Sequence, residues 1–354
     1  RLGVHHLPVL RDEDVLGMFT ATDVVLNQGG NAALLASSIG KAKDLDDLVE
    51  SSTRIPLLHR QLVKNGVRAA QIGETLSHMT DAITVRLLQF AEAQLGKPPV
   101  PYVWLAGGSQ GRREQSSHSD QDNALLLADA AQPEHDAYFA ALAKIVSDGL
   151  NACGFVYCPG DAMATNPKWR QPLAAWRDYF DRWILTPEPM ALMLASIWFD
   201  LRPVHGEFEL FEAMQQAVLP KARGSQFFLA YMMANAMQHR PPLGFFRQFV
   251  LVHDGQHDDT LDLKHTGIVP VTDIARVLAL AGGIDEVNTL KRLAAAAAQG
   301  LLSHEMAENL EDALELISGL RVRHQAEQIA RGEEADNFLD PDDLSSLERG
   351  HLKD

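Results

Sequence analysis

Residues 102–128 read YVWLAGGSQGRREQSSHSDQDNALLLA, and they give the strongest indication of the fold class. An apolar run at 102–106 predicts a strand, and Gly107 and Gly108 end it in a tight turn. A polar segment follows that is long enough for a short helix, and a second apolar run at 123–128 predicts another strand. The stretch therefore predicts a strand–turn–helix–strand unit within a small mixed α/β domain.

This unit contains the residue types of a phosphate and metal site. At Gly108 the missing side chain lets the backbone approach a phosphate, and the N–H groups at a helix start point toward it. Ser109 adds a hydroxyl donor. Asp120 and Asp122 are two positions apart at the entry to the second strand, so we expect both carboxylates on one side of the sheet. Adjacent carboxylates repel each other unless a cation lies between them, and Mg²⁺ is the natural choice.

A phosphate cradle beside a Mg²⁺ site is the apparatus of nucleotidyl or phosphoryl transfer. Each part alone also has an ordinary structural interpretation, because Gly-rich turns are common and an Asp-x-Asp pair at a strand end is usually a solvated turn. The parts are much more specific when they occur together in one unit.

The rest of the chain is mainly helical in pattern. Apolar residues repeat every three or four positions across 69–90 and again across 310–320. Residues 134–149 also predict a helix, and an apolar run at 155–157 predicts a third strand. We therefore expect an α+β fold that is mostly α, with a small mixed sheet flanked by helical segments and a helical C-terminal domain.

Composition narrows the function classes. The chain has 354 residues, with 31 Lys plus Arg and 47 Asp plus Glu, for a net charge of −16. An acidic chain is a poor general binder of nucleic acid or anionic membranes, and no apolar run approaches the ~20 residues of a membrane span. Cys153 and Cys158 are too few for a disulfide framework, so we predict a cytoplasmic protein. Without further ligands nearby in the sequence, they do not predict a zinc site.

Several motifs carry a resemblance to known families. Gly108-Ser109, followed after ten residues by Asp120-x-Asp122, resembles the signature of the polymerase-β-type nucleotidyltransferase superfamily. The fuller string, with Arg112 and Glu114, resembles the branch of protein-PII uridylyltransferase and glutamine-synthetase adenylyltransferase. Closer still is the likeness to bacterial nucleotidyltransferases fused to CBS domains, which share the strings at 111–115, 120–125, 158–160 and 200–203.

The resemblance implies a mechanism. Asp120 and Asp122 would hold two Mg²⁺ ions, and Gly108 and Ser109 would bind the β- and γ-phosphates of a nucleoside triphosphate. An acceptor hydroxyl would attack the α-phosphorus in line, and pyrophosphate would leave. By likeness to the family, the acceptor would be a protein, such as a PII-like regulator. The alternative is a non-catalytic nucleotide-binding sensor or a signalling scaffold coupled to CBS modules.

Two roles stay open within this mechanism. Arg112 either neutralises a phosphate or forms a salt bridge with Glu114. The superfamily also has a third carboxylate on a later strand, for which Asp161 and Asp200 are the weak candidates, since neither has the expected spacing. Asp200 has the further interpretation of a buried partner of Arg202, which we slightly favour.

Three basic residues outside the motif, Lys264, Arg276 and Arg170, are further candidates to line a substrate cleft, although surface positions are the simpler expectation.

The beginning of the chain resembles the end of a CBS domain, in the strings at 6–9 and 17–23. In that family the Thr and Asp of the second string often contact an adenosine ribose and phosphate, and the resemblance implies CBS modules upstream. A homodimer is left open. The predicted organisation is a CBS remnant at 1–28, a helical linker domain at 29–98, a nucleotidyltransferase domain at 99–205 and a helical substrate-binding-like domain at 206–354.

Overall fold

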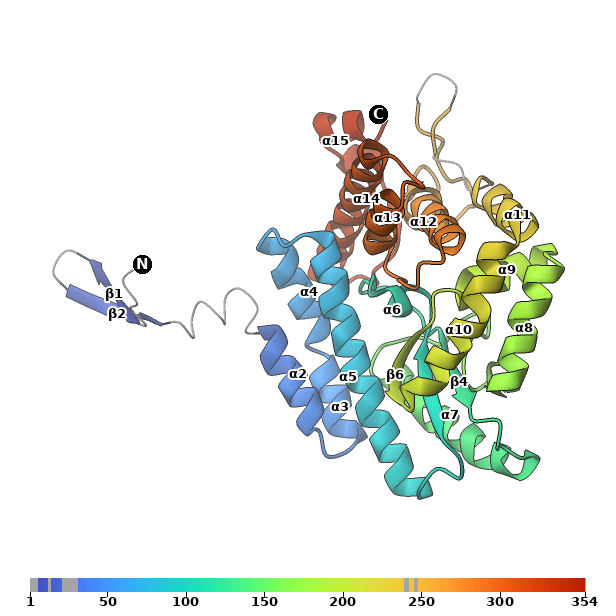
Figure 1. Ribbon diagram of the computed structural model, residues 1–354. Helices are drawn as coiled ribbons and strands as arrows, with labels where there is room; N and C mark the ends of the chain where they lie inside the picture. Colours follow the sequence, from blue (N-terminus) through green and yellow to red (C-terminus); the bar gives the residue numbers. More distant parts are fainter. Residues whose placement is uncertain (1–5, 12–13, 21–30, 239–241, 245–247, 354) are drawn as a thin grey trace.

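The computed structural model describes residues 6–11, 14–20, 31–238, 242–244 and 248–353. Helices dominate and surround a small mixed sheet, with a helical region at the C-terminal end (Figure 1). This arrangement confirms the predicted α+β class.

The first described residues form an antiparallel hairpin. Strand β1 (His6–Arg11) pairs with β2 (Asp14–Thr20). Thr22 and Asp23 of the CBS-like string lie outside the described residues, so the CBS remnant at 1–28 stays a prediction.

Among the described residues, four helices precede the central sheet, and the last is the longest of them. They are α2 (Asn31–Lys41), α3 (Leu45–Ser52), α4 (Ile55–Lys64) and α5 (Ala69–Leu95). The buried face of α5 follows the predicted register through Ile72, Leu76, Ile83 and Leu87. Helix α5 ends at Gly96, whose φ of 87° lies in the left-handed region that glycine tolerates.

The central sheet has four strands in the order β5 (Arg170–Pro172), β4 (Asn123–Leu127), β3 (Tyr102–Ala106) and β6 (Arg202–Gly206). Strand β3 is antiparallel to both neighbours, and β4 is parallel to β5. Alternate residues enter two cores: Trp104 and Leu125 pack with α5 and α7 (Asp136–Ala152), whereas Leu105 and Leu126 pack with α8 (Leu173–Leu185) and α10 (Phe208–Gly224). Burial on both faces explains the continuous apolar runs of β3 and β4.

The predicted strand at 155–157 is wrong. That segment has no strand pairing, although the Val156 carbonyl accepts one hydrogen bond, 2.9 Å long, from the N–H of Gln121. Strand β6 lies beside β3, and strand β5 lies beside β4. The apolar pattern of the sequence did not predict either of these two strands. Both strands are short, contain proline and carry polar residues, because they lie at the two edges of the sheet.

The C-terminal region packs helices together over the start of the sheet domain. Helix α9 (Pro189–Trp198) precedes β6 and packs in the core of the sheet with α8. The elements of the C-terminal region are α11 (Gln226–Ala236), β7 (Leu261–Asp262), η4 (Lys264–Ile268), α12 (Val269–Gly282), α13 (Thr289–Ala298), α14 (His304–Arg331), β8 (Phe338–Leu339) and α15 (Ser346–His351). Helices α12, α13 and α14 group together above the short helix α6 (Gly108–Arg112) (Figure 1).

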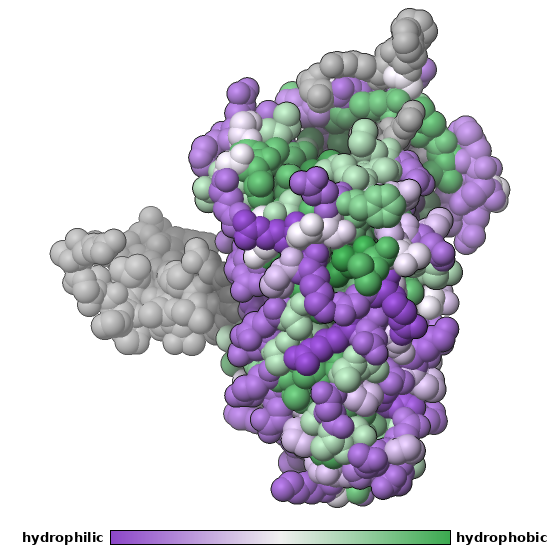
Figure 2. Space-filling view, turned by 45° about the vertical axis from the view of Figure 1, so that its right-hand side comes forward, coloured by the Kyte–Doolittle hydropathy of each residue, from purple (hydrophilic) through white to green (hydrophobic). Residues whose placement is uncertain are grey.

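Surface character differs between the two ends of the molecule. Figure 2 shows apolar side chains gathered in the upper part of the visible face, while the lower part is mostly hydrophilic. An apolar cavity of about 640 Å³ lies between α12 and α14, lined among others by Val271, Ile274 and Ile317. Within the described residues, no helix combines the length and the apolar character that crossing a bilayer requires.

Candidate functional site

The two aspartates lie on the segment that leads into β4. Gln121 and Asn123, which alternate with them, are buried on the opposite side. The side-chain amide of Gln121 donates to the carbonyl of Phe155 at 2.8 Å, and the side-chain oxygen of Asn123 accepts from the N–H of Ala164 at 2.8 Å. These bonds hold the segment, and the alternation leaves Asp120 and Asp122 together on the other side, with ligand atoms within 4.8 Å of each other.

The glycine turn after β3 lies directly against Asp122. The N–H of Gly107 donates to the Asp122 carbonyl at 2.7 Å. A Cβ atom placed on Gly108 would lie 2.1 Å from Asp122 Oδ2, and the φ of Gly108 is +50°. Glycine suits this position for two reasons: the backbone is left-handed, and the Asp122 carboxylate would have to rotate away from a Cβ atom. The phosphate-cradle turn and the metal-type carboxylate are thus in contact.

The electrostatics of the pair favour a cation. Burial, and after it the negative charge of Asp120, raise the pKa of Asp122 to about 6, while Lys264 and Arg112 act in the opposite direction. Neither aspartate forms an ion pair with a residue that the structure describes. A divalent ion bound between the two carboxylates would remove this repulsion, so the residues present fit a metal site.

The third group beside the pair is a thiol. Cys158 joins Asp120 and Asp122 in the described group of potential metal ligands, and all three side chains are partly exposed. Burial, followed by the charge of Asp122, raises the pKa of the Cys158 thiol to about 11. The sequence did not predict this proximity, because Cys158 is far from the aspartates along the chain.

A cleft of about 80 Å³ begins at Ser109, next to the glycine turn. Lys264 of η4 and Arg321 of α14 line it from the C-terminal region. Arg321 is buried, donates to Asn337 at 2.6 Å, and burial lowers its pKa to about 10. The cleft therefore brings Ser109 together with two basic side chains from another part of the chain, whereas Gly108, Asp120 and Asp122 are not among its lining residues.

Two family models match the chain. Residues 53–190 match the model described as putative nucleotidyltransferase DUF294, and residues 226–354 match the one described as putative nucleotidyltransferase substrate binding domain. The two matched ranges are thus similar to a nucleotidyltransferase domain and to a substrate-binding domain. No match was found among the curated proteins. Asp120, Asp122 and Ser109 fall in the first matched range, and Lys264 and Arg321 fall in the second.

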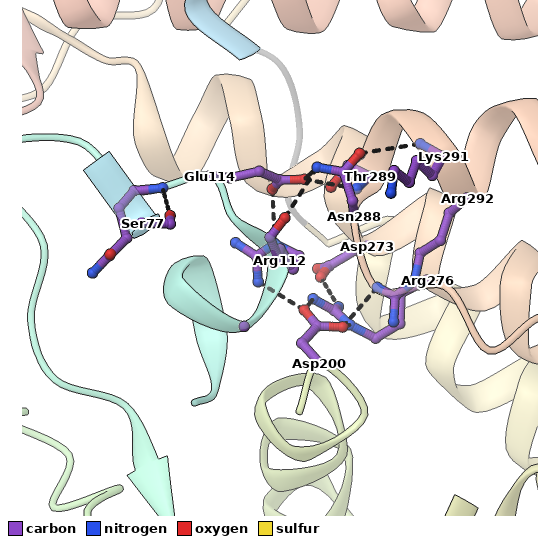
Figure 3. A network of polar contacts seen from close by, with 12 residues as sticks. Ser77, Arg112, Glu114, Asp200, Asp273, Arg276, Asn288, Thr289, Lys291 and Arg292 are labelled. Atoms are coloured by element: carbon purple, nitrogen blue, oxygen red, sulfur yellow. Dashed lines mark hydrogen bonds and ion pairs between the residues drawn. The ribbon is translucent and has the colours of Figure 1, made fainter. Parts of the chain in front are cut away.

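Arg112 and Glu114 form a salt bridge with each other. The Nε of Arg112 is 2.8 Å from Glu114 Oε2, and its Nη1 is 2.7 Å from Asp200 Oδ2 (Figure 3). Glu114 also accepts from the N–H of Thr289 at 2.6 Å and from the Asn288 amide at 3.3 Å. Of the two roles left open, the salt bridge is the one that the contacts support.

Asp200 is fully buried among arginines. Arg276 and Arg292 each approach its carboxylate to 2.6 Å, and Arg112 completes the set (Figure 3). Burial alone would raise its pKa, but these three guanidinium groups hold the pKa of Asp200 far below its ordinary value. The prediction that Asp200 pairs with Arg202 is wrong, because Arg202 pairs with Asp81 at 2.8 Å. Asp200 therefore serves the contact between domains and lies outside the metal-ligand group.

Asp161 also lies outside the metal-ligand group. Its backbone has φ of 54°, and its side chain is exposed and accepts from the Asn166 amide at 2.9 Å. Within the described residues, the aspartate pair thus has a thiol beside it instead of a third carboxylate.

Of the three basic candidates for the cleft, Lys264 is the one that lines it. Arg276 is buried with Asp200 and Asp273, and Arg170 is buried with Asp136 at 2.9 Å. Arg321 was missed, and the only sequence signal for it is its position on the apolar stripe of α14, which predicts packing and not binding.

Proposed function

We propose that this chain transfers a nucleoside monophosphate from a nucleoside triphosphate to a hydroxyl acceptor, with Mg²⁺. The observation that carries the proposal is the contact between the Gly108 turn and Asp122, since that contact brings a phosphate-binding backbone to a pair of metal-type carboxylates. The match of residues 53–190 to the model described as putative nucleotidyltransferase DUF294 supports nucleotidyltransferase activity in general, without naming the nucleotide or the acceptor.

The proposal assigns metal binding and phosphate binding to different residues. Asp120 and Asp122 bind the metal, and the N–H groups that follow Gly108, together with the Ser109 hydroxyl, hold the phosphates. Lys264 lines the cleft that Ser109 also lines, and it supplies a positive charge to the triphosphate. When bound, the metal neutralises charge that develops on the phosphates. The acceptor oxygen forms a bond to the α-phosphorus while the bond to pyrophosphate breaks.

The acceptor is proposed from the resemblance alone. The likeness to protein-PII uridylyltransferase favours a protein hydroxyl, as on a PII-like regulator, in the cytoplasm. The acceptor can be sought by measuring pyrophosphate release with and without a PII-like protein.

A second candidate function is a nucleotide-binding sensor without turnover, or a signalling scaffold coupled to CBS modules. The observation that favours it is that the described residues place no third carboxylate beside the pair, because Asp200 is enclosed by arginines and Asp161 bonds to Asn166. Both candidates require the same metal and phosphate site, so they are separated by turnover and not by binding.

The test is calorimetric titration of ATP, UTP, GTP and CTP with Mg²⁺, with pyrophosphate release measured in parallel. We expect Mg²⁺-dependent binding of one nucleotide by the wild type and its loss in Asp122→Asn. The matched control is Asp312→Asn, an exposed aspartate on α14. Binding with pyrophosphate release supports the enzyme, and binding without it for any acceptor supports the sensor. If no nucleotide binds, both candidates are wrong.

A further inference from the structure

Arg321 is a buried arginine without a carboxylate partner. It lies on α14 and lines the cleft that begins at Ser109. The other buried arginines that the structure describes are all paired with carboxylates: Arg276 and Arg292 with Asp200, and Arg170 with Asp136. For Arg321 the described residues supply no ion pair, and its one hydrogen bond goes to the neutral side chain of Asn337. Burying an unpaired charge is costly, so we expect such an arginine where an anionic ligand supplies the opposite charge.

The carboxylates that line the same cleft already have basic partners. Glu114 pairs with Arg112 at 2.8 Å, and Glu315 pairs with Arg68 at 3.7 Å. Lys264 is a half-buried lining residue, and no carboxylate in the described part of the chain forms an ion pair with it. Lys264 and Arg321 are therefore two positive charges without a partner, in a chain whose net charge is −16.

Asn337 holds both basic residues in position. Its side-chain oxygen accepts from Arg321 Nε at 2.6 Å, and its backbone carbonyl accepts from the N–H of Leu263, the residue before Lys264, at 3.0 Å. Because Asn337 is uncharged, it orients the guanidinium group without neutralising it. The described residues supply no acceptor for Nη1 and Nη2 of Arg321, so these groups remain to donate to a ligand.

Neutral polar groups of the lining are also left without partners. Thr272 is buried, and its hydroxyl has no hydrogen-bond partner among the described residues; the same holds for the side-chain oxygen of Gln115. Buried polar atoms are normally paired, so these two independently indicate a polar ligand. The cleft of about 80 Å³ also has room for a tetrahedral oxyanion, since one water needs only about 10–15 Å³ on the same measure.

We propose that Arg321 and Lys264 form a binding site for an oxyanion of the phosphate class. Two positive charges match a phosphate group with close to two negative charges, whereas a single carboxylate would balance only one of them. Ser109 follows Gly108 and lines the same cleft, so the oxyanion is either the terminal phosphate of the bound nucleotide or a separate phosphate compound. The first source rests on the proposed function. The second does not, and the site itself needs no metal ion.

The test is calorimetric titration with inorganic tripolyphosphate in the presence of a chelator. The full chain is compared as wild type, Arg321→Gln and Arg323→Gln. The last is the matched control, because Arg323 lies on the same helix, pairs with Glu348 at 2.6 Å and does not line the cleft. We expect the wild type and Arg323→Gln to bind equally well, and the affinity of Arg321→Gln to be lower by about tenfold or more. Equal affinity in the two variants, or no binding by the wild type, would overturn the proposal.

Inorganic phosphate distinguishes the two sources of the oxyanion. If the site holds the terminal phosphate of the nucleotide, phosphate should compete with the triphosphate, and Arg321→Gln should weaken binding of the triphosphate more than binding of the diphosphate. If the site holds a separate compound, phosphate should also bind to the nucleotide-loaded chain, and Arg321→Gln should leave nucleotide affinity unchanged. Either result supports the site and names its ligand.

Failure of the inference is distinguishable from failure of the proposed function. Tripolyphosphate binding should persist in Asp122→Asn, because the site contains no metal ligand. Nucleotide binding that requires Asp122, without any tripolyphosphate binding, would contradict the inference and leave the proposed function intact. Tripolyphosphate binding that requires Arg321, without binding of any nucleotide, would support the inference and contradict the proposed function.

A measurement on the wild type alone covers the case in which Arg321→Gln does not fold. In a chelator, phosphate at low millimolar concentration should raise the unfolding temperature more than sodium chloride of the same ionic strength, because a ligand stabilises the state that binds it. If the variant folds, it should be at least as stable as the wild type without the anion, since it lacks a buried charge that has no carboxylate partner. Equal effects of phosphate and chloride on the wild type would contradict the proposal.

Discussion

We expect Asp122 to destabilise the metal-free protein, because folding places its carboxylate in a partly buried position beside Asp120. Its pKa rises from 3.8 to about 6 on folding, so between these values the folded chain binds more protons than the unfolded chain. Stability must therefore fall as the pH rises through this window. For the metal-free protein at pH 7, we expect Asp122→Asn to raise the free energy of unfolding by on the order of 2 kcal/mol. Denaturant unfolding in the presence of a chelator measures this difference.

Comparing the wild type with Asp122→Asn also tests whether Asp122 binds a divalent ion. Divalent ion should stabilise the wild type at pH 7 and have little effect on Asp122→Asn, since a ligand stabilises the state that binds it. Below about pH 3 the two proteins should have similar stability, because the carboxyl is then mostly protonated in both the folded and the unfolded chain. A variant less stable than the wild type at pH 7 would show that Asp122 is an ordinary structural residue.

At the scale of the element, the turn between β3 and α6 depends on Gly108. A methyl group there would lie 2.1 Å from Asp122 Oδ2, at a backbone φ of +50°. We expect Gly108→Ala to displace the carboxylate and to weaken metal and nucleotide binding at least about tenfold, in addition to a backbone cost of about 1 kcal/mol. Calorimetric titration measures the binding, and thermal unfolding measures the stability.

Gly66 provides the matched control for this turn. Its φ of +67° is similar, but nothing lies within 4 Å of the position that a Cβ would take. Gly66→Ala should therefore show the backbone cost in stability and leave binding unchanged. If the two variants bind metal equally well, the contact between the turn and Asp122 has no functional consequence.

At the scale of the whole molecule, one carboxylate ties the sheet domain to the C-terminal helices. Asp200 follows α9 and pairs with Arg112 of α6, Arg276 of α12 and Arg292 of α13. Asp200→Asn would leave three buried guanidinium groups short of one negative charge. We expect a loss of about 3–5 kcal/mol in the free energy of unfolding, the range for breaking a buried ion pair.

The control for Asp200 is an ion pair at the surface. Asp181 pairs with Lys221 at 2.7 Å in a partly exposed position, so Asp181→Asn should cost less than about 1 kcal/mol. Denaturant unfolding compares the two variants. Unchanged stability in Asp200→Asn, together with lost metal binding, would instead make Asp200 the third metal carboxylate.

Local pattern was enough to predict the unit from β3 to β4, including its turn and the shared side of Asp120 and Asp122. Apolar runs identify strands buried on both faces, glycine marks the turn, and a period of two places alternate residues on one side. These signals depend only on neighbours along the chain. The register of α5 was predicted for the same reason.

Tertiary structure alone decided what depends on residues far apart in the sequence. Asp200 and Arg292 are 92 positions apart, and Arg112 and Asp200 are 88 apart, so no local pattern could show that they pair or that Arg202 has another partner. The edge strands β5 and β6 lacked an apolar run, because a strand at an edge needs less burial. Cys158 reaches the aspartates through backbone hydrogen bonds between a loop and the start of β4, and such bonds leave no trace in residue type.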